Sequence, residues 1–600
     1  MLIVLAGRGS IPDLTDAGEL LELASLAGDD AAALVRAVAP RADDDTVRRL
    51  VEGSGGVPYF LEEQARAAQE SPDGAVAAPL ELSVFLSARL DELGSRCKSL
   101  LGEIAVAGEG IRLDVLSKLT QVPAGEVDLL LDELCGRRVL VREWGRTGEV
   151  VRFRHALMRE AAIDGLLAVH RAELHRQLAA LLAQTPGAAR PEDLAHHYEA
   201  AGDPEHAARC WLEAGRVAAG TGASTEAITL FRRSLSALDD LPEGTERTTL
   251  ELDVQLGLGT AASALEGYTS PNARAAFERA VALGERLGDT ATIFPALWGT
   301  SSYWFVLGEH RLDHGLVERL VRIAEEQQDP RFRFEAAFVA GYRNLHLGDL
   351  ARARDELERA TQHLGLEPIA SLPEDSGIVS RSTLSIVLWL LGESARSAEA
   401  ASEALRLVDA LDPTARRAAL TTCWVHSTLA WRAELAGDSQ LAVTLAERSA
   451  GIAADRHFLT WLGAATLHRS IALCRLGRFE EGLPILTAMV DAWRAAGRDA
   501  TGRQLHPMLM SPYFAGRLAE AWLATGDVDG AARLVDELLA ETARSGERFW
   551  DAALLKLRAA AASALGAAPD AVRADLDAAR ALARDQGALA LADALEGSPT

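Results

Sequence analysis

Glycine residues recur in this chain at a spacing that is typical of helical-repeat folds. Between Gly222 and Gly566 the successive intervals are 45, 41, 40, 44, 45, 40, 49 and 40 residues. Glycine permits the tight turn between two helices, and a small residue five positions later lets the second helix approach the first. We predict one helical hairpin per repeat, about nine in all. The markers are Gly222, Gly267, Gly308, Gly348, Gly392, Gly437, Gly477, Gly526 and Gly566, with Gly202 before them, and seven are followed by a small residue: Ala207, Ala227, Ala353, Ala442, Gly482, Ala531 and Ala571.

Residues 186–600 are almost wholly helical in pattern, with apolar positions three and four apart and no convincing strand. The period exceeds the ~34 residues of a standard tetratricopeptide unit. We therefore expect longer helices that stack into a right-handed superhelix. Two prolines break the pattern at residues 366–380, which we predict as an inserted loop. Residues 570–600 predict one alanine-rich helix and a short tail.

The first 185 residues differ from this array. Residues 77–185 predict three short helices, a two-stranded wing and a connecting helix, which together make a winged helix. The wing strands are expected at residues 138–142 and 150–153, around a turn at 144–148. Residues 1–76 hold one apolar strand at 2–6 and then short helices. Because one parallel-type strand cannot make a sheet, this segment is predicted to be the remnant of a larger α/β NTPase domain.

Composition excludes several classes of protein. The chain has 61 Lys and Arg against 87 Asp and Glu, a formal net charge of −26. This charge repels nucleic-acid phosphates and anionic lipids, so neither a nucleic acid nor a membrane is an expected partner. No apolar run approaches 18 residues and no signal peptide is evident, which predicts a cytoplasmic protein. The five cysteines show no CxxC spacing, so they are expected to be buried apolar residues that form neither a disulfide framework nor a metal site.

Three lysines are all that the chain contains: Lys98, Lys118 and Lys556. A phosphate-binding P-loop needs a Gly-Lys-Ser/Thr sequence, and none of these lysines follows a glycine. The chain therefore has no Walker A site of its own. It also has no G-x-S-x-G nucleophile elbow and no cysteine in a local catalytic signature. No catalytic residue is predicted, and the chain is expected not to be an enzyme.

Several phrases together resemble the C-terminal halves of bacterial signal-transduction ATPases of the STAND/AAA type, especially those fused to class III adenylate or guanylate cyclases. LIVLAGR is similar to the last core strand of their nucleotide-binding domain, GGVPYFLEE to their lid motif, and FRHALMREAAIDGLL to the segment after the wing. LAHHYEAAGDPEHAARCWLEAG, EGYTSPNARAAFERAVALGERLGD and SGERFWDAALLKLRA resemble landmarks of their tetratricopeptide-like array. The resemblance implies a nucleotide-gated switch, a winged-helix spacer and a helical-repeat sensor.

Three residues are nucleotide-contact candidates through this resemblance alone. Arg8 matches the sensor arginine that ends the strand, and Pro58 matches the lid proline near the adenine. His155 matches the histidine that reaches the β-phosphate of ADP, although Ala156 stands where relatives with the fuller motif have aspartate. The alternatives are an exposed arginine, a proline that starts a helix and a packed histidine. Because the P-loop and the cyclase domain are absent, ATP or ADP is expected only if a P-loop is supplied elsewhere.

Other clusters have both a functional and a structural interpretation. Seven arginines and two glutamates lie between Arg137 and Arg159 and form a basic island. This island is expected to contact DNA, a nucleotide or another part of the chain, or to be a solvated surface. His170 and His175 are not spaced for one helical face, and His196 and His197 are expected to pack the first hairpin, so zinc is not predicted. Six tryptophans of the array are expected in the inter-helix core, with one or two lining the concave groove as anchors for a peptide or small effector: Trp304, Trp389, Trp424, Trp431, Trp461 and Trp493.

The hypothesis that follows is a non-catalytic regulatory protein that senses a protein or small-molecule signal in its repeat groove. A second hypothesis makes the chain the regulatory part of an ATP-binding cyclase whose catalytic part is missing or encoded separately. A separately encoded NTPase or cyclase chain would then be its partner. Under these hypotheses the sequence is a shortened gene product, a product of a wrongly placed start or a stand-alone regulatory half. A third hypothesis, a transcription activator of the large ATP-dependent type, expects a C-terminal helix-turn-helix that residues 570–600 do not predict.

Overall fold

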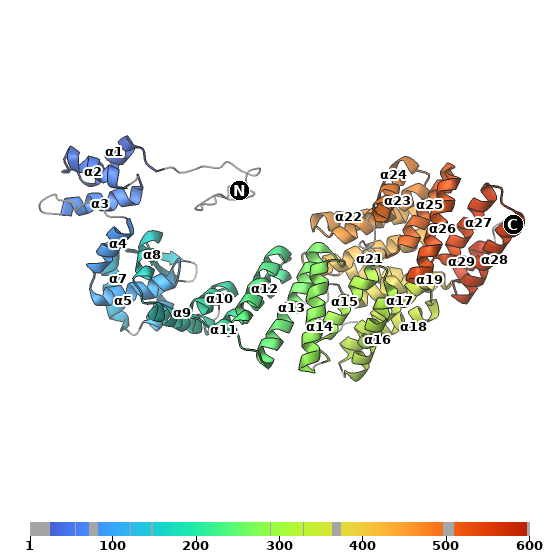
Figure 1. Ribbon diagram of the computed structural model, residues 1–600, viewed down its shortest axis with the longest axis horizontal. Coiled ribbons are helices and arrows are strands. Elements are labelled where there is room, and N and C mark those ends of the chain that lie inside the picture. The colour runs from blue at the N-terminus through green and yellow to red at the C-terminus, as the bar shows by residue number, and fades with distance from the viewer. Residues whose placement is uncertain are drawn as a thin grey trace. The chain divides into compact units, whose positions relative to one another are not determined.

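The computed structural model describes residues 25–54, 56–70, 82–120, 122–145, 148–185, 187–288, 290–327, 329–362, 374–495 and 509–596. Contacts divide the chain into two compact units, one of Met1–Ala189 with Ala200–Gly202 and one of Arg190–Glu199 with Asp203–Thr600 (Figure 1). The predicted strand at residues 2–6 and Arg8 lie outside the described residues. None of the described helices combines the length and the apolar character that a membrane span requires.

The first three described helices of the first unit are short and share a small core. They are α1 (Gly28–Val38), α2 (Asp44–Ser54) and α3 (Pro58–Glu70). Their buried faces meet around Val35, Leu50 and Leu61. Amphipathic helices of this length depend on such a shared core, because short helices are marginal in isolation.

The described remainder of the first unit combines six helices with a small antiparallel sheet. Its elements are α4 (Leu82–Asp91), α5 (Ser95–Val106), β1 (Ile111–Arg112), α6 (Leu113–Leu119), α7 (Ala124–Gly136), β2 (Leu140–Gly145), β3 (Gly148–Phe153), α8 (Ala156–Asp164) and α9 (Ala168–Ala183). The hairpin β2–β3 confirms a pair of strands here, with Leu140 opposite Phe153. The predicted limits were wrong, because Trp144, Gly145 and Gly148 of the expected turn pair within the sheet. Strand β1, which the sequence analysis missed because it has two residues, pairs with β3 and gives the order β1-β3-β2. The domain limits at 76/77 and 185/186 stay predictions.

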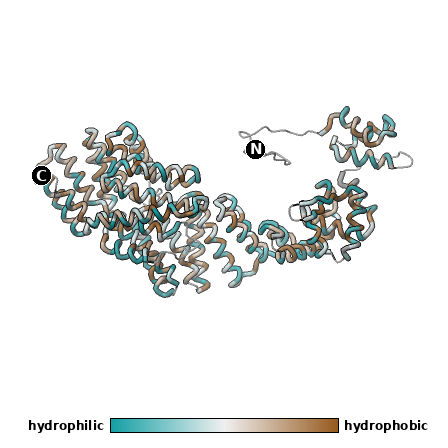
Figure 2. Tube along the Cα trace, turned by 180° about the vertical axis from the view of Figure 1, so that it is seen from behind, coloured by the Kyte–Doolittle hydropathy of each residue, from teal (hydrophilic) through white to brown (hydrophobic). Residues whose placement is uncertain are grey.

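The second unit is an array of antiparallel helical hairpins, and along its helices hydrophobic and hydrophilic residues alternate (Figure 2). After α10 (Pro191–Ala200) come nine hairpins in the described part of the chain: α11 (Pro204–Gly220) with α12 (Ser224–Asp239), α13 (Thr245–Glu266) with α14 (Pro271–Leu287), α15 (Phe294–Val306) with α16 (His310–Glu326), α17 (Pro330–Leu347) with α18 (Leu350–Thr361), α19 (Ser376–Leu390) with α20 (Ser394–Asp409), α21 (Arg416–Leu435) with α22 (Ser439–Asp455), α23 (Leu459–Arg475) with α24 (Phe479–Ala495), α25 (Ser511–Thr525) with α26 (Val528–Ser545), and α27 (Asp551–Ala564) with α28 (Pro569–Asp585), followed by α29 (Leu589–Glu596). This confirms the predicted mainly α, superhelical hairpin fold.

The ten marker glycines all occupy the turns for which they were predicted. Their φ angles lie between +69° and +97°, a region that side chains other than glycine rarely adopt. Five of the six alanines that follow by five positions are buried, as is Gly482, whereas Ala571 of the last hairpin is exposed. The repeat signal in the sequence therefore identified the hairpin turns correctly.

Phenylalanine rings lock neighbouring hairpins together by lying between two glycines. Phe277 of α14 lies against Gly259 of α13 and Gly299 of α15, where an added Cβ would overlap its ring. Phe231 of α12 lies in the same way between Gly215 and Gly257. The missing side chains give the ring close access to two helices at once, so these glycines serve packing and not turns.

Two sequence predictions for this unit were wrong in their limits. Helix α19 begins at Ser376, inside the predicted loop 366–380, and Asp375 caps it by accepting from the backbone N–H groups of Gly377 and Ile378. Nearly every residue of α19 is buried, so it lacks the polar stripe that marks an amphipathic helix. Residues 570–600 hold two helices instead of one, because Gly587 turns the chain at φ +71° between α28 and α29.

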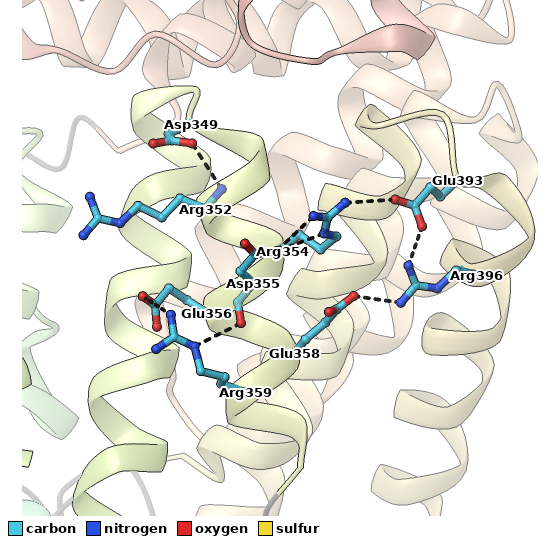
Figure 3. Close-up of polar contacts among 9 residues, drawn as sticks. All are labelled: Asp349, Arg352, Arg354, Asp355, Glu356, Glu358, Arg359, Glu393 and Arg396. Carbon is cyan, nitrogen blue, oxygen red and sulfur yellow. Dashed lines mark hydrogen bonds and ion pairs between the residues drawn. The ribbon is translucent and has the colours of Figure 1, made fainter. Parts of the chain in front are cut away.

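Ion pairs link successive hairpins on the outer surface of the array. Arg396 of α20 pairs with Glu358 of α18 at 2.7 Å, and Arg354 donates to Glu393 at 3.5 Å (Figure 3). Figure 3 also shows Arg359 with Glu356, at 2.6 Å in the same helix. These side chains are partly exposed, so their contribution to stability is small.

Candidate functional site

The helical array curves around a cavity of about 300 Å³ whose wall is rich in aromatic side chains. Its walls come from the first helices of several hairpins, α15, α17, α21, α23 and α25, together with parts of α16 and α24. Ten aromatic side chains line it: Tyr268, Trp298, Phe305, Phe338, Tyr342, Trp424, Trp431, Trp461, Trp493 and Phe514. A cavity of this size and lining has the character of a small-molecule site.

Helix geometry explains why these residues face one interior. On α15 the cavity residues include Trp298, Ser301, Ser302 and Phe305, and on α21 they are Trp424, Ser427, Thr428 and Trp431. Positions i, i+3, i+4 and i+7 lie on one face of a helix, so each set forms a single stripe. In both stripes an aromatic residue is followed by two residues with hydroxyl groups and then by a second aromatic residue. This recurring pattern was present in the sequence and is the signal that the sequence analysis overlooked.

Aromatic rings of different hairpins contact one another around the cavity. The ring centroid of Trp424 lies 5.0 Å from that of Trp461 and 5.4 Å from that of Tyr342. Tyr342 in turn lies 5.2 Å from Phe305. Such tilted and edge-to-face contacts fix ring positions. The cavity therefore has a wall that is shaped before any ligand enters.

A buried acid also lines the cavity. Asp313 of α16 has no exposed surface, and it accepts a hydrogen bond from Ser301 through Oδ1. Its Oδ2 has no hydrogen-bond partner among the described residues, and Arg343 Nε lies 3.9 Å away, beyond hydrogen-bond distance. Burial raises the pKa of Asp313 to about 6. An incompletely paired carboxylate in an aromatic cavity is a costly arrangement that a ligand would relieve.

A second polar group reaches the cavity from the opposite hairpins. His468 of α23 lines the cavity, and its Nδ1 lies 2.9 Å from Oε1 of Glu434 in α21. Glu434 also accepts from the hydroxyl of Tyr513 at 2.5 Å. The carboxylate orients the imidazole by accepting from Nδ1, which leaves Nε2 as the group for any further partner.

Three tryptophans of the cavity keep an unused donor. The Nε1 atoms of Trp298, Trp431 and Trp461 are shielded from water and have no hydrogen-bond partner within the described parts of the chain. Trp298 and Trp431 are both more than nine-tenths buried. Unsatisfied buried donors that gather around one cavity, beside Asp313, are the polar groups expected of a recognition site.

Tertiary closure is what brings these hairpins together. The backbone N–H of Leu509 donates to the carbonyl of Val306 at 3.0 Å, and that of Arg548 donates to the carbonyl of His346 at 2.8 Å. Arg416 at the start of α21 donates to the carbonyl of Ala264 in α13 at 3.0 Å. Hairpins that are remote in sequence thus become neighbours around the cavity.

The tryptophan predictions had different outcomes. Trp424 and Trp431 are buried in the core and also line the cavity, and Trp461 and Trp493 line it while half-buried. Trp304 and Trp389 are not among the cavity residues. The sequence analysis missed Trp298, Asp313 and His468. An isolated aspartate or histidine does not indicate a cavity before the fold is known.

The nucleotide-contact candidates lie in the first unit. Pro58 is exposed at the first position of α3, and His155 is the residue before α8. Tyr59, which follows Pro58, stacks its ring on His155 with centroids 3.8 Å apart. The structure thus brings together this histidine and the segment that resembles a lid. Burial lowers the pKa of His155, which favours a neutral imidazole. The lysines of the first unit, Lys98 and Lys118, do not follow a glycine, so the Gly-Lys-Ser/Thr sequence of a phosphate-binding loop is absent there.

Acidic neighbours neutralise much of the predicted basic island. Arg142 pairs with Asp128 at 3.1 Å and contacts Glu149, and Arg152 pairs with Glu143. Arg137 pairs with Glu133 at 3.2 Å. Among the residues that the structure describes, no group of three or more His, Cys, Asp or Glu side chains is placed to hold a metal ion. All five cysteines are free thiols.

Comparisons with known proteins place the fold but not a family. No protein-family model matches the sequence. Protein R02095 of Rhizobium meliloti strain 1021, which is uncharacterised, is 26% identical over 573 residues, covering 90% of this chain and 52% of that protein. This chain thus spans about half the length of the curated relative that it matches.

Solved structures are similar at low sequence identity. A Signal Transduction ATPase with Numerous Domains from Pyrococcus horikoshii, with a tetratricopeptide repeat sensor, matches with a TM-score of 0.50 at 12% identity, covering 89% of this chain and 74% of that chain. A Rap protein in complex with competence and sporulation factor matches with a TM-score of 0.45 at 11% identity, covering 64% of this chain and 99% of that chain. The first of these likenesses shows a tetratricopeptide-like fold.

Proposed function

We propose that this chain is a non-catalytic regulatory protein that senses a small effector in the aromatic cavity of its helical-repeat array. The observation that carries the proposal is the cavity itself, about 300 Å³ in volume and lined by ten aromatic residues from separate hairpins. A ligand there touches several hairpins at once and so favours one curvature of the superhelix over another. The Pyrococcus horikoshii protein, whose repeat domain is described as a sensor, supports this role through its fold.

A cavity-filling substitution tests this proposal. Gly463 of α23 lines the cavity, and a Cβ at this position meets no atom within 4 Å, so Gly463→Leu fills the space without disturbing the helix. The matched control is Gly451→Leu in α22, an exposed helical glycine that is equally free of neighbours. Thermal shifts of the full chain are measured against a library of small metabolites.

The expected result is a ligand that raises the Tm of the wild type and of Gly451→Leu but not of Gly463→Leu. Binding stabilises the native state in proportion to the logarithm of ligand concentration over Kd. A library without any such ligand, or a ligand whose effect survives Gly463→Leu, contradicts the proposal.

A second candidate function concerns the first unit. The stacking of Tyr59 on His155 joins the segment that resembles a nucleotide lid to the histidine that resembles a phosphate contact. If a P-loop is supplied by a separate ATPase or cyclase chain, these residues would sense its nucleotide. Calorimetry with ADP or ATP and magnesium tests this proposal. Saturable binding that is lost in His155→Ala supports it, and the absence of heat with that partner present contradicts it.

A further inference from the structure

The cavity holds one acid whose charge is only partly compensated. Oδ2 of Asp313 faces no hydrogen-bond donor among the described residues, and the nearest cation, Arg343, stands 3.9 Å from it through Nε. Arg343 itself lines the cavity, as do the phenols of Tyr268 and Tyr342 and the imidazole of His468, which Glu434 already engages. Asp313 is thus the carboxylate that lines the cavity, and its Oδ2 lacks a hydrogen-bond donor, which a group with positive charge would supply.

The aromatic wall favours the same sign of charge. The faces of Trp, Tyr and Phe rings carry partial negative charge and attract cations, and Trp attracts them most strongly. Five tryptophans line this cavity, and two of them, Trp424 and Trp461, lie 5.0 Å apart at an angle of 48°. The chain already uses this interaction in its core, where Arg517 lies 4.9 Å from the ring centroid of Trp550 and 5.1 Å from that of Tyr513.

The charge of the whole chain reinforces this preference. A formal net charge of −26 gives a negative potential that concentrates cations near the surface and repels anions. Arg343 is a cation that lies near Asp313, but at 3.9 Å its Nε does not donate a hydrogen bond to Oδ2 of that carboxylate. An anionic ligand, in contrast, would meet this field, the aromatic faces and the carboxylate of Asp313.

We propose that the effector is a small organic cation, an ammonium compound with an aromatic or apolar body, whose nitrogen pairs with Asp313 while its body packs between the tryptophans. This inference rests on the proposed function, since it names the chemistry of the same cavity. The ammonium donates to Oδ2 of Asp313, and Ser301 holds the other carboxylate oxygen in place. Asp313 is therefore the residue that determines specificity for charge.

Three probes of one shape and different charge test the proposal on the full chain. They are phenethylammonium, neutral 2-phenylethanol and anionic 3-phenylpropanoate, and their Kd values are measured by quenching of tryptophan fluorescence. Phenethylammonium is expected to bind about tenfold tighter than the alcohol or more, and the anion more weakly than both. Asp313→Asn is expected to bring the ammonium and the alcohol within about twofold of each other. Glu335→Gln is the matched control, because this buried acid is not among the cavity residues.

Each outcome separates the two proposals. If the alcohol binds saturably and the ammonium binds no tighter, the cation inference fails while the cavity remains a ligand site. If the anion binds most tightly, Arg343 is the partner and the inference is again overturned. If no probe binds, the cation inference fails, and the thermal-shift library with Gly463→Leu decides the proposed function. If the preference for the ammonium persists in Asp313→Asn or is lost in Glu335→Gln, the role of Asp313 is contradicted. The comparison of the three probes on the wild type stays valid even where a variant folds poorly.

Discussion

Nδ1 of His346 lies 2.9 Å from Oε1 of Glu547, a contact that spans 201 positions of the sequence. His346 lies near the end of α17 and Glu547 lies between α26 and α27, and both are buried. The same Oε1 accepts from the backbone N–H of Met510 at 2.9 Å, and the carbonyl of His346 accepts from the N–H groups of Arg548 and Phe549. This polar junction closes the array around the cavity.

Removal of the Glu547 carboxylate is expected to destabilise the array strongly. Glu547→Ala leaves the imidazole of His346 and the N–H of Met510 without an acceptor in a buried site. The expected loss is about 3 kcal/mol in the free energy of unfolding, because each orphaned buried group costs about 1–3 kcal/mol. Urea unfolding followed by tryptophan fluorescence measures it. Glu547→Gln, which keeps an acceptor oxygen, is expected to lose less, and equal losses in both variants would argue against this explanation.

The outer ion pairs are expected to matter far less. Arg396 pairs with Glu358 and Glu393 between α18 and α20, but about half of its side chain is exposed (Figure 3). Arg396→Ala is therefore expected to change the free energy of unfolding by less than about 1 kcal/mol. The same urea experiment at low and at high salt checks this, since salt screens any contribution that exists. A loss as large as that of Glu547→Ala would contradict the assignment of stability to the interior.

The buried acids Glu335 and Glu374 are expected to make the array less stable as pH rises from about 5 to 8. Buried histidines such as His426, whose pKa burial lowers from 6.5 to about 4, act in the opposite direction below about pH 6.5. Burial raises the pKa of Glu335 to about 8 and that of Glu374 to about 7, against a usual value near 4.5. Between these values the folded chain holds protons that the unfolded chain has released, so the stabilisation is complete below pH 4.5 and is lost as pH rises.

Glu335→Gln isolates one of these protons. The substitution mimics the protonated acid and retains an oxygen that Ser376 donates to. It is expected to reduce the pH dependence by at most about 1.4 kcal/mol per pH unit between pH 5 and 8, the slope that corresponds to one proton. Unfolding free energies at pH 5, 6, 7 and 8 measure the slope. A variant with the slope of the wild type would show that Glu335 is ionised in the folded state at neutral pH.

The glycines beside Phe277 are expected to resist even a methyl group. In Gly259→Ala the new Cβ would lie 2.6 Å from the Phe277 ring, so helices α13 and α14 of this hairpin must move apart. Overpacking of this kind costs about 1–3 kcal/mol. Phe277→Leu should relieve the clash, so the double variant is expected to lose less than the two single losses combined, as a double-mutant cycle measures. Gly451→Ala has no neighbour within 4 Å and is expected to stabilise α22 by about 0.5–1 kcal/mol.

Local patterns in the sequence predicted the hairpins well because a hairpin is a local structure. Glycines such as Gly348 and Gly526 mark turns with positive φ, and a residue without a side chain is needed there whatever lies around it. The same local logic failed at α19, whose buried surface on all sides removes the amphipathic stripe, and at Gly587, where one more glycine divides the last predicted helix. Strand β1 is too short for any periodicity to show.

The sequence by itself determined the hairpin array, the absence of a Walker A lysine and the acidic charge, because each depends on residue types and their spacing along the chain. Only the tertiary structure decided which tryptophans line the cavity and that Asp313 joins them. Trp298, Trp424 and Trp461 lie on separate hairpins, and superhelical curvature closed by contacts such as that of His346 with Glu547 sets their distances. Curvature accumulates from small rotations at every hairpin interface, and no local pattern encodes that sum.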